Sequence, residues 1–293
     1  MRTPDRVTLR PRGPFSLALA ASFGFGPREA EPDPRLIRLA FCVDGFREYA
    51  GAVVHADDGE LVFEIHGARD VDAAGEQVER ILSLDHDGEA WAAVGERDPV
   101  IGDLQRRYHG LRPVLFHSPY EAAAWSIIST RYARPLAARV RARIADELGT
   151  ELELAGERIG AFPCPERLLD VTPMPGLGEQ KAQRLREVAT AAFEGRLDPA
   201  RLRSLPPEEA MAEVRRLPGI GPFYAGLVVV RGAGTTDALP VGEPRVRQAA
   251  AHWYGLEEAP SEEELATLAE HWRPFRTWAA VLLRYAWERE AVT

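Results

Sequence analysis

Two carboxylates in one stiff segment are the residues best suited to chemistry. Asp237 and Glu243 stand six positions apart in the run Asp-Ala-Leu-Pro-Val-Gly-Glu-Pro. Pro240 and Pro244 restrict the backbone, and Gly242 allows an unusual turn directly before Glu243. A carboxylate held in a fixed position can stabilise a developing positive charge or activate a water molecule. Glu243 is therefore the first candidate catalytic residue and Asp237 the second.

A glycine hairpin upstream of these carboxylates is a candidate anion site. It reads Leu217-Pro218-Gly219-Ile220-Gly221-Pro222. Two glycines two positions apart let the backbone approach a partner closely, and the proline suits the first position of a second helix. The free N–H groups at the start of that helix favour a phosphate group of a nucleic acid. An ordinary turn between packed helices is the alternative interpretation.

A third motif follows the hairpin and the carboxylate segment along the chain. It reads Trp272-Arg273-Pro274-Phe275-Arg276. Together with the hairpin and the carboxylate segment, it resembles the helix-hairpin-helix DNA glycosylases, specifically the 3-methyladenine DNA glycosylase II type. The resemblance extends over most of the chain and is strongest from about residue 207 to 287. The family carries a catalytic aspartate where this chain has Glu243, and its residue at the position of Asp237 more often caps or braces the loop. The longer side chain leaves two alternatives open, a re-shaped site or a loss of activity.

The resemblance implies an enzyme that flips an alkylated purine out of DNA and hydrolyses its N-glycosidic bond, in base-excision repair. Such bases are cationic, and electron-rich rings attract cations. The expected base pocket is aromatic and consists of Trp125, Phe223, Tyr224 and Trp272. Phe223 also stands where lyase-type relatives have a nucleophilic lysine. A monofunctional glycosylase without strand cleavage is therefore expected.

The resemblance also implies the contacts with double-stranded DNA. The hairpin residues Leu217, Gly219, Ile220 and Gly221 would bind the backbone, with Na⁺ or K⁺ at the carbonyls of Leu217 and Ile220. The turn after the Trp125 helix would supply the wedge that fills the gap left by the flipped base. The family usually has a glutamine-rich pair here, whereas this chain has Thr130 and Arg131, followed by Tyr132. A solvated loop is the alternative for this turn. The expected DNA-contacting residues outside the hairpin are Thr130, Arg131, Tyr132 and Arg245.

Two other functions remain open. A catalytically weak or inactive relative would recognise damaged or distorted duplex without excision, and both Glu243 and the altered turn favour it. A helical protein-interaction module that no longer binds DNA is the third class.

Composition limits the chemistry further. The 293 residues carry a net charge of −9, which argues mildly against a DNA partner, but arginines cluster between 131 and 143. Lys181 is the only lysine, so a Schiff-base nucleophile is almost excluded. Cys42 and Cys164 are too few for an iron–sulfur cluster. We expect two separate thiols in a reducing cytoplasm, no cofactor, and a monomer that is nucleoid-associated when bound to DNA.

The pattern predicts an α+β fold. Residues 1–87 form a small antiparallel sheet with helices, similar to the TBP-like unit of the family. Residues 88–293 form an all-helical body of two subdomains, with the cleft between 115–236 and 88–114 plus 237–293. The apolar run after the basic N-terminus imitates a signal peptide, but it is short, and we favour a folded segment. No stretch approaches the roughly 20 apolar residues of a membrane span.

Overall fold

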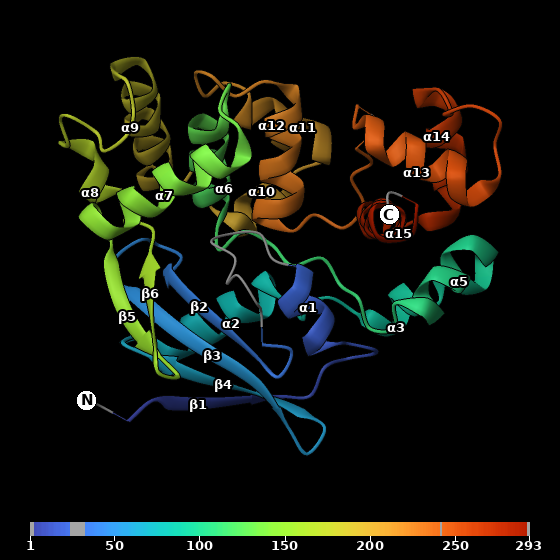
Figure 1. Cartoon of the computed structure of the whole chain (residues 1–293), viewed down its shortest axis with the longest axis horizontal. Helices are drawn as coiled ribbons and strands as arrows, with labels where there is room; N and C mark the ends of the chain where they lie inside the picture. Colours follow the sequence, from blue (N-terminus) through green and yellow to red (C-terminus); the bar gives the residue numbers. More distant parts are fainter. Residues whose placement is uncertain (1–2, 24–32, 241, 292–293) are drawn as a thin grey trace.

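The computed structural model describes residues 3–23, 33–240 and 242–291. Its N-terminal part is a four-stranded antiparallel sheet in the order β1-β4-β3-β2 (Figure 1). Asp58 and Gly59, both with positive φ, form the turn of the β3–β4 hairpin. The bounds are β1 Asp5–Leu9, β2 Leu36–Cys42, β3 Tyr49–Asp57, β4 Glu60–His66, α1 Leu17–Phe23 and α2 Val71–Ile81.

The expectation that only helices follow residue 88 is wrong. A second sheet, β5 (Thr150–Leu154) and β6 (Glu157–Ala161), forms a hairpin between two helices. It packs on the first sheet through Leu154, whose Cδ2 would lie 2.5 Å from a Cβ at Gly51. The glycine is therefore needed for the close approach of the two sheets.

Helices make up the remaining secondary structure of the described residues. Ser261 and Glu264 form a capping box at the start of α14. The bounds are α3 Gly88–Ala92, α4 Val94–Arg97, α5 Pro99–Arg107, α6 Pro119–Ser129, α7 Arg134–Leu148, α8 Glu166–Leu169, α9 Glu179–Phe193, α10 Pro199–Ser204, α11 Pro207–Val214, α12 Pro222–Leu227, the π-helix η1 Val228–Ala233, α13 Pro244–Tyr254, α14 Glu262–Leu268, the 3-10 helix η2 Ala269–Trp272 and α15 Arg276–Glu290. Among the described residues, no helix is both long and apolar enough to cross a bilayer.

Two hydrophobic cores organise the molecule. One joins the four-stranded sheet to α5, α13 and α15, so the C-terminal helices pack with the N-terminal unit. The other contains α6, α7, α9, α11, α12 and η1. In Figure 1 the helices of the second core stand above the sheet, and α13, α15 and α5 lie to the right of them.

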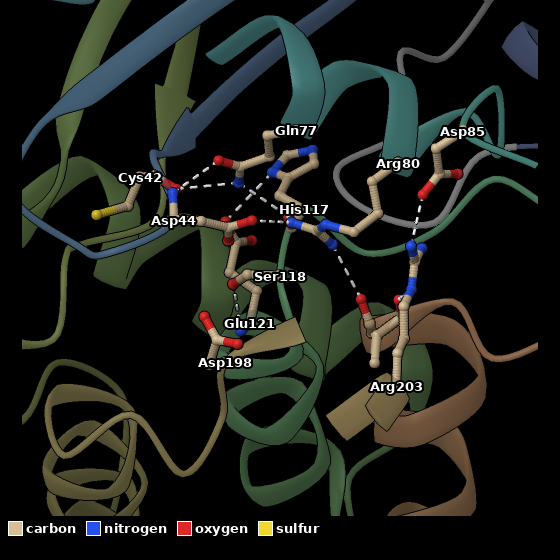
Figure 2. Close-up of polar contacts among 12 residues, drawn as sticks. Cys42, Asp44, Gln77, Arg80, Asp85, His117, Ser118, Glu121, Asp198 and Arg203 are labelled. Atoms are coloured by element: carbon tan, nitrogen blue, oxygen red, sulfur yellow. Dashed lines mark hydrogen bonds and ion pairs between the residues drawn. The ribbon is translucent and has the colours of Figure 1, made fainter. Parts of the chain in front are cut away.

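A polar junction links the sheet unit to the second core (Figure 2). Arg80 of α2 donates to Asp44 at 2.6 Å and to the carbonyls of His117 at 3.0 Å and Gly232 at 3.1 Å. Gln77 of the same helix donates to the carbonyl of His117 at 2.9 Å. Because Arg80 and Asp44 are largely buried, this pair fixes how the sheet unit sits against α6 and η1.

The two cysteines are not separate thiols as expected. Cys42 at the end of β2 and Cys164 after β6 form a disulfide, with their Cα atoms 5.5 Å apart. The two cysteines are 122 positions apart in the sequence, and no sequence signal indicated that they are close, because their proximity follows from the packing of the two sheets. Disulfides are rare in reducing compartments. The expectation of two thiols is therefore corrected, and the cytoplasmic location stays a prediction.

Candidate active site

A cavity of about 1040 Å³ lies between the two groups of helices. One wall comes from α6, α7, α12 and η1, and the other from the loop before α13 and from α13 and α15. Its lining includes Phe116, Trp125, Tyr132, Arg141, Phe223, Tyr224, Glu243 and Arg245. The cavity therefore places the first candidate carboxylate opposite most of the candidate aromatic residues.

The glycine hairpin forms the rim beside this cavity. Leu217 and Ile220 are buried and hold the turn to the core, and the Ile220 N–H donates to the Leu217 carbonyl at 3.1 Å. Gly219 has φ 89°, which only glycine adopts without strain. Gly221 is the N-cap of α12 and Pro222 its first residue, so the predicted helix start is confirmed. The exposed N-terminus of α12 thus opens next to the cavity.

Glu243 is the N-cap residue of α13. Its Oε1 accepts the backbone N–H of Arg245 at 3.4 Å, so the helix itself orients the carboxylate. The side chain is half-buried and lines the cavity. This arrangement keeps a negative charge at one defined place on the cavity wall.

Asp237 lies outside the cavity, whereas a catalytic residue would be expected to lie on its wall. Its carboxylate accepts from Arg273 Nη1 at 2.7 Å and from Arg276 Nε at 2.7 Å, and it does not line the cavity. Arg276 also donates to the Asp237 backbone carbonyl at 2.7 Å. Two arginines therefore use this carboxylate to anchor the start of the loop that carries Glu243, and its catalytic assignment is corrected.

Aromatic side chains form much of the wall opposite Glu243. Trp125, Phe223 and Tyr224 line the cavity, and Phe223 is 57% exposed. The hydroxyls of Tyr224 and Ser129 lie 3.1 Å apart, which fixes the tyrosine at the end of α6. The structure thus brings together three of the four residues expected in a base pocket.

Trp272, the fourth expected pocket residue, lies elsewhere. Its side chain is fully buried and does not line the cavity. The indole Nε1–H donates to Asp98 Oδ2 at 2.9 Å, an atom that also accepts the Tyr254 hydroxyl at 2.5 Å. Its pocket assignment is corrected, because this hydrogen bond and its packing make Trp272 a core residue.

The turn after α6 separates its three expected DNA-contacting residues. Thr130 is the C-cap of α6 and donates to the Ser126 carbonyl at 2.7 Å. Arg131 is exposed, with φ 59°, and neither residue lines the cavity. Tyr132 lines the cavity, so it is the member of this turn nearest to the pocket.

A buried ion pair in the wall was not expected from the sequence. Arg141 lines the cavity and donates to Glu121 at 2.6 Å, while the His117 ring lies 3.2 Å from the other carboxylate oxygen. Burial acts to raise the pKa of Glu121, but His117 and Arg141 outweigh it and lower this pKa to about 2. Ser118 caps the start of α6 by accepting the Glu121 N–H, whereas the Glu121 side chain does not return to the cap and binds Arg141 instead.

No cluster of three or more histidine, cysteine, aspartate or glutamate side chains suited to a metal ion occurs within the described residues. The cavity itself presents the Glu243 carboxylate, aromatic rings and arginine side chains. A fixed anion facing a roomy aromatic cavity suits a reaction that builds positive charge on a bound ring.

No protein-family model matches the chain. It is 21% identical to a DNA-3-methyladenine glycosylase of Bacillus subtilis, over 69% of this chain and 68% of that protein. It is 28% identical to DNA-3-methyladenine glycosylase 2 of Escherichia coli, over 64% of each. The structure superposes on a 3-methyladenine DNA-glycosylase from Archaeoglobus fulgidus with a TM-score of 0.77, at 22% identity over 98% of this chain and 99% of that one.

These relatives support the resemblance to the helix-hairpin-helix DNA glycosylases of the 3-methyladenine DNA glycosylase II type. The solved structure shows that the chain shares the fold of such a glycosylase. The chain spans about two thirds of the length of those two relatives. The α+β fold expected from the sequence is confirmed, with the β5–β6 hairpin as an addition.

Proposed function

We propose that this protein is a monofunctional DNA glycosylase that excises alkylated purines from double-stranded DNA in base-excision repair. The observation that carries the proposal is that Glu243 shares one cavity with Trp125, Phe223 and Tyr224, beside the glycine hairpin. DNA is the partner, and the enzyme acts as a monomer. The wall suits a flipped base that stacks between rings.

The carboxylate supplies the charge that the reaction needs. Breaking the N-glycosidic bond builds positive charge on the sugar, as in glycoside hydrolysis. Glu243 stabilises this charge and orients or deprotonates the attacking water. Because a cationic alkylpurine is already a good leaving group, a carboxylate displaced by one methylene suffices for it. A neutral damaged base is a poorer leaving group and needs stronger stabilisation of the transition state, so it is excised poorly.

The proposed enzyme lacks lyase activity because no lysine amine is placed to act as a nucleophile in the cavity. Phe223 occupies the position of the nucleophilic lysine in lyase-type relatives, and Lys181 does not line the cavity. The product is therefore an intact strand with an abasic site. Borohydride trapping of a covalent protein–DNA adduct in high yield would contradict this.

The hairpin binds the DNA backbone in the proposal. The N–H groups at the start of α12 point out of an exposed, glycine-rich turn, and such groups bind phosphate. A sodium or potassium ion at the carbonyls of Leu217 and Ile220 is part of the proposal. The Leu217 carbonyl already accepts one N–H, and its second lone pair is the one offered to the ion.

Incubation with duplex that carries one defined alkylated purine tests the function. Wild type should release free base and leave an abasic site. Glu243→Gln keeps the size of the side chain and removes its charge, so it should abolish release while duplex binding stays nearly intact. Equal release by the two proteins excludes Glu243 as the catalytic residue.

A second candidate function rests on two departures from the family pattern, Glu243 itself and the Thr130-Arg131 pair. It is a weak or inactive relative that binds damaged or distorted duplex. If neither wild type nor Glu243→Gln releases base, and both bind duplex that contains an abasic site, this second function replaces the first.

A further inference from the structure

Lys181 is held between two parts of the turn after α6. Its Nζ donates to the Ile128 carbonyl at 2.8 Å, near the C-terminus of α6. The same Nζ lies 3.2 Å from the centre of the Tyr132 ring, a close cation–π contact. Burial lowers the pKa of Lys181, as expected of an amine held against protein rather than extended into water. One ammonium group thus ties the end of a helix to a ring that lines the cavity.

The helix that carries Lys181 also reaches the hairpin. Arg184, one turn further along α9, packs on Gly219, where a Cβ would lie 2.8 Å from the Arg184 Cδ. Both residues extend from the first two turns of α9 (Glu179–Phe193). A single helix therefore sets the spacing between the hairpin and the Tyr132 turn.

The backbone of the turn does not hold Tyr132 by itself. Arg131 before it has φ 59°, a conformation that costs energy for a non-glycine residue. The Tyr132 N–H donates to the Ser129 carbonyl at 3.0 Å, but this bond leaves the ring free to rotate about χ1. The ring packs on one side against the second hydrophobic core, and the cation–π contact with Lys181 adds a polar interaction that acts on the ring itself.

We propose that Lys181 is a positioning residue, which holds the Tyr132 ring where it takes the place of the extruded base. This inference rests on the proposed function. Lys181 does not touch the base or the sugar. It sets the orientation of a planar group that stacks in the duplex, and α9 keeps this group at a fixed distance from the phosphates bound by the hairpin.

A base-extrusion measurement tests the role directly. The probe is duplex DNA with 2-aminopurine beside an alkylated purine, because unstacking of 2-aminopurine raises its fluorescence. Lys181→Met keeps the length of the side chain and removes the charge. We expect a smaller fluorescence rise on binding and a single-turnover excision rate lowered about tenfold, with little change in duplex affinity.

Three variants separate positioning from stability. Lys181→Arg keeps the cation and should recover part of the fluorescence rise. The double variant Lys181→Met with Tyr132→Leu should match Tyr132→Leu alone, because the lysine acts through the ring. Arg186→Met is the matched control, since Arg186 lies on α9 and pairs with Glu179 at 2.6 Å instead of with the turn. It should behave as wild type.

Lys181→Met could lower the melting temperature but leave the fluorescence rise and the excision rate unchanged. That result overturns the inference, because the lysine would then only stabilise the fold. Additive effects in the double variant overturn it as well. If wild type binds and excises while all Lys181 variants equal it, only this inference fails. If wild type binds no duplex at low salt, the proposed function fails with it.

Discussion

The Arg141 guanidinium and the Glu121 carboxylate meet at 2.6 Å in the wall of the cavity, and both side chains are less than 10% exposed. Their charges are therefore poorly screened. Removal of Glu121 leaves Arg141 buried without its carboxylate partner, and removal of Arg141 leaves Glu121 with His117 alone. This pair links the conformation of α6, which carries Trp125, to that of α7.

The pair should make the protein sensitive to acid. The pKa of Glu121 is lowered from 4.5 to about 2 in the fold, with burial opposing and His117 and Arg141 causing the shift. A lowered pKa contributes stability that is present above about pH 4.5 and is lost as pH falls toward 2. The contribution is about 3 kcal/mol. Denaturant unfolding from pH 7 to 2 should show Glu121→Gln less stable at pH 7, with the gap closing in acid. Parallel curves would refute the assignment.

Glu243→Asp distinguishes a re-shaped site from a decayed one. If the cavity has adapted to glutamate, aspartate retracts the carboxylate and lowers the excision rate by up to about 10²-fold. If the chain has only drifted from the family pattern, aspartate restores or raises the rate. We expect the decrease, because the Glu243 side chain already caps α13. Single-turnover release of alkylated base measures it.

Gly221→Asp should abolish duplex binding without harming the fold. No atom lies within 4 Å of a Cβ at Gly221, so the side chain fits. A carboxylate at the N-terminus of α12 stabilises that helix but repels the phosphate. Gly178→Asp is the matched control, because Gly178 is the N-cap of α9 and equally open. Affinity for an abasic-site duplex at several salt concentrations is the measurement, and equal binding by wild type and Gly221→Asp would argue against the hairpin.

Trp272→Phe should cost stability and spare activity. The change removes the indole N–H that donates to the buried Asp98, at a cost of about 1–3 kcal/mol. Excision at a temperature where the variant is folded should equal that of wild type. Trp125→Ala, which alters the cavity wall, should lower the excision rate instead. A selective loss of activity in Trp272→Phe would return this residue to the base pocket.

Local patterns gave the parts of the fold that local physics determines. Asp58-Gly59 set the β3–β4 turn, and Pro222 set the start of α12. The β5–β6 hairpin was not predicted from the sequence because its strands are short and charged. In addition, its turn places Ala155 at φ 49°, a conformation that no sequence rule favours for alanine.

Tertiary partners decided the remaining assignments. Trp272 and Asp237 lie in segments that match the family. Trp272 is held in the core by Asp98, which is distant in the sequence. Asp237 is held by the side chains of Arg273 and Arg276. Glu121 follows Ser118 at the spacing of a capping box, but its carboxylate accepts a hydrogen bond from Arg141 on the next helix instead. Spacing located the segments correctly but did not show which way each side chain points.

The disulfide between Cys42 and Cys164 also determines how the protein responds to force. It bridges 122 positions, so a pull on the two termini passes through the sulfur atoms and bypasses everything between them. Roughly 400 Å of contour length is withheld from extension until the bond is reduced. The fully extended length of a pulled molecule should therefore be short when the disulfide is intact and long when it is reduced. In the oxidised protein, β3, β4, α6 and α7 lie inside the covalent loop and are not stretched.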